Sequence, residues 1–202
     1  MSTPEKKKNK KSDTPEKLKR YQRAKFESYK KINNLKINDN EAYISIKVDK
    51  YDNIISPYSL DERPSLKGEF LDEIEHRASI IPLDYPLVLE IHNNNFTAEE
   101  KIMVRKLIKN HFTFLAINKE FEIKRLKRKS LYLIIAGILT FIISMLVYNI
   151  DIMFPFFEIL NFITWYSVWE CGELVIFDQD GLKEQLIKYK HLSKIRVLYD
   201  KD

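Results

Sequence analysis

The chain has few of the residues on which several protein classes depend. Its 202 residues include one cysteine, Cys171, which excludes an internal disulfide framework. Four scattered histidines disfavour a preformed metal site, four glycines disfavour a glycine-rich phosphate loop, and no cofactor is expected. The net positive charge is confined to residues 1–31, which hold twelve Lys and Arg against four Asp and Glu. The sequence pI of about 9.0 therefore reflects an N-terminal tail, and the other 171 residues carry a net charge of −3.

A long uncharged segment lies in the second half of the chain. Residues 130–150 contain no Asp, Glu, Lys or Arg, and they would form about 30 Å of helix, the thickness of the hydrocarbon core of a bilayer. A second apolar segment, residues 152–172, follows after a tight turn at residues 149–151. Glu158 and Asn161 lower the hydropathy of this second segment, so an interfacial helix is the alternative to a second membrane span.

Basic residues flank the two apolar segments on one side only. Five of the six residues from Lys124 to Lys129 are basic, five more basic residues lie between Lys183 and Arg196, and the connecting turn has none. Lys and Arg near the ends of membrane spans stay on the cytoplasmic side. The sequence therefore predicts a transmembrane hairpin in the cytoplasmic membrane, with both termini in the cytoplasm.

The basic tail, residues 1–31, has too few apolar residues in its first half to bury surface, and we expect it to be largely disordered. Tyr21, Phe26 and Tyr29 follow in its second half, where a membrane-surface helix is one interpretation. The plain interpretation is a solvated basic tail that also enforces topology. If the tail has a partner, the expected one is the anionic inner leaflet, and nucleic acid is a less favoured alternative. The basic residues assigned to lipid contact are Lys6, Lys7, Lys8, Lys10, Lys11, Lys19 and Arg20.

Alternating and helical patterns appear between the tail and the first apolar segment. Residues 42–48 alternate apolar and polar side chains, which predicts a half-buried strand, and residues 49–64 are typical of a loop. A helix is expected over residues 65–79 with Ser65 as its N-cap, and a short buried strand over residues 87–91.

A capping-box pattern predicts where a long helix begins. Thr97 is followed three residues later by Glu100, the spacing at which each side chain can bond to the other residue's amide. No Gly or Pro interrupts the helical pattern before Gly137, so this helix can run directly into the first apolar segment. Residues 182–192 are expected to be helical and residues 194–199 to form a final strand.

Together these elements predict an α+β fold: a small cytosolic mixed-sheet domain with an inserted two-helix transmembrane hairpin, because two strand–helix–strand crossovers imply parallel strands. The expected division is a tail over residues 1–31, a cytosolic domain over 32–129, the hairpin over 130–174, and a return to the cytosolic domain over 175–202.

Polar residues form a stripe along each apolar segment. At 100° per residue, the residues on one line of the second segment are Glu158, Asn161, Trp165, Trp169 and Gly172, and those on the first are Ser130, Gly137, Thr140, Ser144 and Tyr148. We expect the two stripes to face each other and to support homo-oligomers. A carboxylate in hydrocarbon is costly, so Glu158 is either a proton or ion contact or a hydrogen-bonding group within the assembly.

Signals for catalysis are weak. Glu73, His76 and Arg77 share one helix, and Asp49 and Asp52 share a loop, but no spacing of a nucleophile and a base is recognisable. The sequence therefore does not favour an enzyme. Cys171, at the expected cytoplasmic edge of the membrane, is best interpreted as a buried inert thiol, with lipidation or redox activity as alternatives.

Several separated motifs resemble a group of uncharacterised prokaryotic two-span membrane proteins. They are Asp49-x-x-Asp52-x-Ile54-x-Ser56-Pro57-Tyr58, Phe70-Leu71, His111-Phe112, and Glu158-Ile159 with Trp165 and Trp169-Glu170 downstream. The resemblance covers roughly residues 43–199 and implies the two-span architecture without a mechanism. The sequence thus favours a membrane-anchored interaction or scaffolding protein, with an oligomeric channel or transport accessory that uses Glu158 as the alternative.

Overall fold

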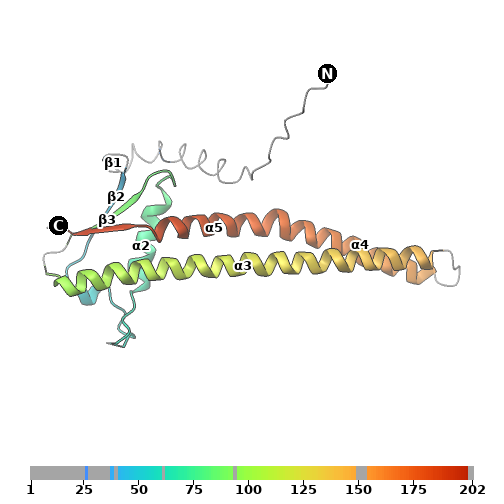
Figure 1. Cartoon of the computed structure of the whole chain (residues 1–202), viewed down its shortest axis with the longest axis horizontal. Coiled ribbons are helices and arrows are strands. Elements are labelled where there is room, and N and C mark those ends of the chain that lie inside the picture. The colour runs from blue at the N-terminus through green and yellow to red at the C-terminus, as the bar shows by residue number, and fades with distance from the viewer. Residues whose placement is uncertain are drawn as a thin grey trace, which may run out of the picture. The chain divides into compact units, whose positions relative to one another are not determined.

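A computed structural model describes residues 26, 37–38, 41–60, 62–92, 95–148 and 154–199 (Figure 1). The chain is an α+β protein. Its elements are β1 (Ile37–Asn38), β2 (Glu41–Lys47), the 3₁₀ turn η1 (Tyr51–Asn53), α2 (Gly68–Ser79), β3 (Leu87–His92), α3 (Ala98–Val147), α4 (Phe154–Glu173), the π-helix η3 (Leu174–Asp178), α5 (Gln179–Leu192) and β4 (Arg196–Tyr199).

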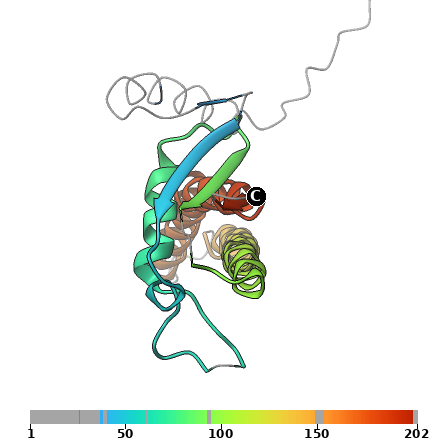
Figure 2. The same cartoon turned by 90° about the vertical axis from the view of Figure 1, so that its left-hand side faces the viewer.

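The sheet is small and mixed. Strands β2, β3 and β4 run parallel, and the two-residue β1 pairs antiparallel with β2, in the order β1-β2-β3-β4; Figure 2 shows β2 and β3 side by side. The expected alternation is confirmed in β2, where Ala42, Ile44 and Ile46 are buried and the residues between them are not. Val88 and Leu89 point to opposite faces of the central strand β3 and are both buried, as expected for a parallel strand covered on both faces.

Helix α2 begins at Gly68, so the expected start with Ser65 as N-cap was wrong. Ile55 and Leu66 form an antiparallel bridge, and the amide of Lys67 donates to the carbonyl of Ile54 at 2.8 Å. This pairing keeps residues 65–67 extended, and the N-cap position falls on Lys67, whose side chain makes no capping hydrogen bond.

The capping box at the start of α3 is confirmed. The amide of Thr97 donates to Glu100 Oε2 at 2.7 Å, and the amide of Glu100 donates to Thr97 Oγ1 at 3.2 Å. From there α3 continues through 50 residues to Val147, so the expected run of one helix into the uncharged segment is also confirmed.

Helices α4 and α5 are joined by the π-helix η3, without a loop between them. The last helix therefore begins at Gln179, three residues before the expected start at Leu182. The strand that follows, β4, lies within the range expected for it.

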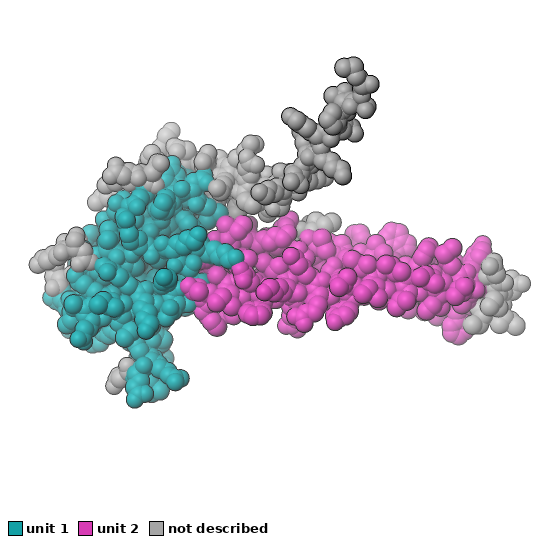
Figure 3. Space-filling view, viewed as in Figure 1, with its two compact units in different colours: residues 1–112, 190–202 teal, residues 113–189 magenta. Residues whose placement is uncertain are grey.

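The structure divides into two compact units, residues 1–112 with 190–202 and residues 113–189 (Figure 3). Phe26, the one described residue of the basic tail, is 2% exposed, with its ring 5.7 Å from that of Tyr85. Its ring belongs to the core of the first unit, so the interpretation that it inserts among headgroups or stacks on bases was wrong.

Among the described residues, α3 alone is long and apolar enough to cross a membrane by length and composition. Helix α4 has the length but not the hydropathy, as Glu158 and Asn161 suggested. The turn expected at residues 149–151 lies outside the described residues.

Candidate functional site in the α3–α4 helix pair

Helix α4 contacts the C-terminal part of α3 at several levels. Thr140 Oγ1 and Thr164 Oγ1 are 2.9 Å apart, and the rings of Tyr148 and Phe157 are 5.2 Å apart. At Gly137 the backbones approach so closely that an added Cβ would lie 3.3 Å from the Cβ of Ser167. As the residue number rises on α3 it falls on α4, so the two helices are antiparallel.

The residues that face inward follow a repeat of three and four positions, which is the spacing of a coiled-coil seam. On α3 the buried or half-buried residues from Ile123 onward are Ile123, Leu126, Ser130, Leu133, Gly137, Thr140, Ser144 and Val147. On the partner side the matching residues are Phe157, Leu160, Thr164, Ser167, Cys171, Leu174, Gln179, Leu182 and Leu186. We call these two sets the seam.

The exposed side chains of α3 change from charged to apolar at Ser130. Before it, the seam holds Ile123 and Leu126, and the outward residues Lys124, Arg125, Lys127 and Arg128 are charged and exposed. After it, the seam holds Gly137, Thr140 and Ser144 together with Leu133 and Val147. The large apolar side chains that point outward between residues 131 and 146 are 45–71% exposed. Small polar residues inside and apolar residues outside are the arrangement of helices packed within a membrane.

An ion pair lies next to Ser130, at the level where the exposed side chains of α3 change from charged to apolar. Lys129 Nζ lies 2.9 Å from Glu170 Oε1, and in the next layer Ser130 Oγ lies 3.1 Å from Cys171 Sγ. The hydrogen bond and the charge of Glu170 raise the pKa of Lys129 above its usual value, so this lysine stays charged. Cys171 is half-buried in the seam, as the interpretation of an internal thiol expects.

Of the two polar stripes predicted to face each other, the one on α3 lies in the seam except for Tyr148, which is 65% exposed, and the polar residues of the one on α4 do not lie in the seam. Glu158, Asn161, Trp165 and Trp169 are all exposed, each tryptophan by 68%, and lie away from α3. At the level of Gly137, the near-contact with Ser167 leaves no room between the helices for a side chain as large as tryptophan. Thr140 and Ser144 lie in the seam as expected.

Sequence reasoning missed the residues that α4 does use. Thr164, Ser167 and Cys171 are small and recur at steps of three and four, which is the signal that could have found them. The hydroxyls of Thr164 and Ser167 also bond to the carbonyls one turn earlier, so no unsatisfied donor remains in this part of the seam.

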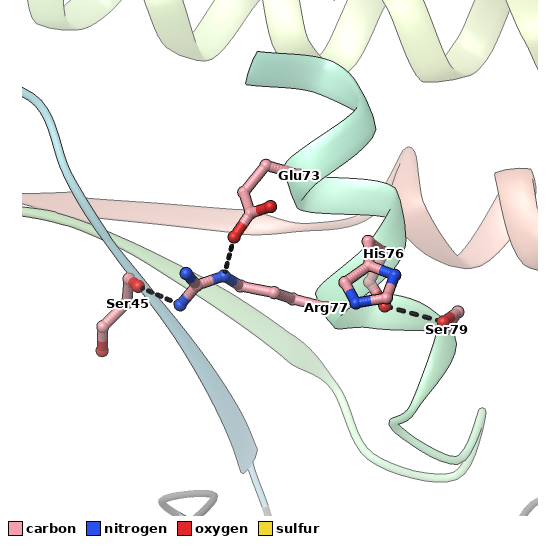
Figure 4. A network of polar contacts seen from close by, with 5 residues as sticks. All are labelled: Ser45, Glu73, His76, Arg77 and Ser79. Carbon is pink, nitrogen blue, oxygen red and sulfur yellow. Dashed lines mark hydrogen bonds and ion pairs between the residues drawn. The ribbon is translucent and has the colours of Figure 1, made fainter. Parts of the chain in front are cut away.

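In the first unit, the polar cluster on α2 ties the helix to the sheet. Arg77 Nε donates to Glu73 Oε1 at 2.6 Å, and its Nη1 donates to the carbonyl of Ser45 at 2.8 Å (Figure 4). His76 contributes its carbonyl to the hydroxyl of Ser79 at 2.7 Å. A cleft of about 360 Å³ lies here. The charges of Glu73 and Arg77 are committed to each other, which assigns this cluster a structural role.

Asp49 lies in the loop after β2, 3.9 Å from Lys47 Nζ, and Asp52 lies in η1. The basic positions Lys6, Lys7, Lys8, Lys10, Lys11, Lys19 and Arg20 lie outside the described residues. Within the described part of the chain, no group of three or more His, Cys, Asp or Glu could hold a metal ion.

Comparison of the chain with models of protein families, with curated proteins and with solved structures found no match. The resemblance to two-span membrane proteins therefore stays a prediction, and a functional assignment has to come from the physical features of the two units.

Proposed function

We propose that the chain is an integral protein of the cytoplasmic membrane that anchors an α+β interaction or scaffolding domain on the cytoplasmic side. In this proposal residues 130–150 and 152–172 cross the bilayer as a hairpin. The observation that carries the proposal is the change of the exposed side chains from charged to apolar at Ser130, because exposed apolar side chains along a helix pair are unfavourable in water and favourable in hydrocarbon.

The pairing with α3 explains how the less apolar α4 could enter the membrane. Its polar seam residues would be covered by α3, so its exposed residues would present mainly aromatic and aliphatic side chains to lipid. Trp165 and Trp169 lie toward the end of α4 that also carries Glu170, which suits anchoring at the membrane interface. The basic run before Ser130 favours the cytoplasm for both ends of the hairpin.

A loop of the first unit supports the interaction role. Tyr58 is 95% exposed and Leu60 is 72% exposed. The loop around them is ordered by local hydrogen bonds, including Ser59 Oγ to the carbonyl of Ser56 at 2.7 Å. An exposed aromatic residue held on an ordered loop is a feature of binding surfaces.

Reporter fusions would test the topology. Fusions of an alkaline phosphatase or a fluorescent protein after Lys10, Ile150 and Asp202 should report cytoplasm, outside and cytoplasm respectively. The chain should also remain in the membrane after carbonate extraction. An outside signal at either terminus, or release by carbonate alone, would overturn the proposal.

The exposed position of Glu158 favours a second candidate function, an oligomeric channel or transport accessory. A carboxyl group facing lipid is unfavourable, and a further copy of the helix pair would cover it. Liposome flux that is lost in Glu158→Gln would support this function, provided that the detergent-solubilised mass shows an oligomer. Flux that is absent or unchanged favours the scaffold.

Lipid binding by the basic tail remains part of the proposal. A peptide of residues 1–35 should bind anionic vesicles, release them at high salt and ignore neutral vesicles, since each basic residue near the surface contributes about 1 kcal/mol. Preference for single-stranded nucleic acid at the same salt would contradict lipid binding.

A further inference from the structure

Beside the π-helix, the second unit contains a cleft of about 640 Å³ that carries charges of both signs. Helix α3 lines it with Glu122, Arg125 and Lys129, and the opposite wall is formed by Asp178, Gly181 and Gln185. The cleft lies beside the part of α3 that precedes Ser130, where the exposed side chains are charged.

Two of these charges are already in salt bridges. Lys129 is paired with Glu170, and Glu122 accepts hydrogen bonds from Lys119 at 2.9 and 3.1 Å. Within the part of the chain that the structure describes, Arg125 and Asp178 form no salt bridge, although the charge of Asp178 contributes to raising the pKa of Lys129. The cleft therefore offers a ligand a cation and an anion that are not held in salt bridges.

The positions of the charges along α3 have a definite order. Lys129 is the last charged residue before the uncharged segment, Arg125 lies about 6 Å further from it, and Glu122 lies about 10 Å further, at 1.5 Å per residue. The polar headgroup layer adds about 5–8 Å on each side of the hydrocarbon core. Cationic groups thus come first when leaving the hydrocarbon, and an anionic group comes next.

We propose that this cleft binds the headgroup of phosphatidylethanolamine. The inference rests on the proposed membrane insertion. The lipid phosphate, which is the part of the headgroup nearer the hydrocarbon, binds Arg125 and Lys129. The terminal ammonium, further out, donates to Asp178 and Glu122. A choline headgroup has no N–H to donate to these carboxylates, and a glycerol headgroup has no positive charge for them, so the cleft selects ethanolamine.

Gly181 provides a way to fill the cleft without disturbing the fold. A Cβ added at this residue would meet nothing within 4 Å, so a side chain there extends into open space. Gly181→Trp should occupy the cleft. Gly181→Ala is the matched control, because it adds the same helix-stabilising Cβ and leaves most of the cleft open.

The experiment uses the full chain reconstituted in nanodiscs that contain equal amounts of palmitoyl-oleoyl phosphatidylethanolamine, phosphatidylcholine and phosphatidylglycerol. Native mass spectrometry after release counts the retained lipids. The wild type and Gly181→Ala should retain ethanolamine lipid about tenfold over choline lipid, since charge-assisted hydrogen bonds are at stake, and Gly181→Trp should lose this preference. Asp178→Asn should lower the ethanolamine preference, and Arg125→Gln should lower the retention of all three lipids.

Three results would overturn the proposal: equal retention of the three lipids by the wild type, a preference for phosphatidylglycerol, or an ethanolamine preference that persists in Gly181→Trp. Failure of the chain to enter nanodiscs of any composition would instead refute the membrane insertion. In that case glycerophosphoethanolamine in solution still tests the cleft, because it should bind the wild type and Gly181→Ala but not Gly181→Trp, and absence of binding overturns the site.

Discussion

The seam predicts that one substitution links α3 to α4 covalently. Ser130 Oγ and Cys171 Sγ are 3.1 Å apart, and Cys171 is the chain's one cysteine. In Ser130→Cys, two sulfur atoms face each other across this contact, and a small shift brings them to the S–S bond length of about 2.05 Å. The two residues are 41 positions apart, and closing a loop of that length stabilises the folded chain by about 4 kcal/mol on the chain-entropy model.

A protease site between Ile150 and Asp151 makes the link visible. After mild oxidation and cleavage, Ser130→Cys should run as one band without reductant and as two fragments with it. Leu131→Cys is the matched control, because this neighbouring residue points outward with 54% exposure and should give two fragments in both lanes. Equal linkage in both variants, or none in Ser130→Cys, would refute the antiparallel packing described here.

Two further predictions concern packing and pH. Gly137→Leu should lower the free energy of unfolding of the detergent-solubilised protein by about 1–3 kcal/mol through overpacking against Ser167. Gly172→Leu should cause a smaller loss, because a Cβ added at Gly172 meets nothing within 4 Å, and equal losses would contradict the close approach at Gly137. Burial lowers the pKa of His191, opposed in part by its hydrogen bond to the carbonyl of Tyr85, so the folded state favours the neutral ring. Stability should then fall as pH drops below about 6.5, where only the unfolded chain takes up the proton. His191→Gln should lessen this dependence in chemical unfolding at pH 7.5 and 5.5, and an unchanged dependence would exclude His191 as a source.

Much of the fold follows from local patterns in the sequence. The alternation in β2 and the reciprocal hydrogen bonds of Thr97 and Glu100 depend on residues close together in the chain, so their physical causes can be recognised without a structure. Ser65 fails for a different reason. A good capping residue was overridden by pairing between residues 54–56 and 65–67, a contact that composition does not reveal.

In the candidate site, the packed face of α3 could be predicted from the sequence but that of α4 could not, because the packing of a partner element again decides the outcome. A helical wheel shows which residues share a face, but not how close the partner helix comes. On α3 the polar residues are also small, so the predicted face is the packed one. On α4 the large polar residues Glu158 and Trp165 lie on one face and the small ones, Thr164 and Ser167, on another. Steric fit at Gly137 selected the small ones, and hydropathy alone could not distinguish the two faces.

The π-helix has a consequence for how the chain tolerates changes in length. The buried residues Leu174 and Gln179 lie five positions apart across the π-helix, which is the spacing of a π-helical hydrogen bond, whereas the other described seam residues of α4 and α5 follow one another at three or four positions. Removing one residue within η3 would turn this step into four and continue the ordinary repeat as an α-helix. A deletion elsewhere in α4 would instead rotate one part of the helix by about 100° and carry its seam residues away from α3. The segment Leu174–Asp178 is thus the place where the chain can lose a residue while both helices keep the same face toward their partner.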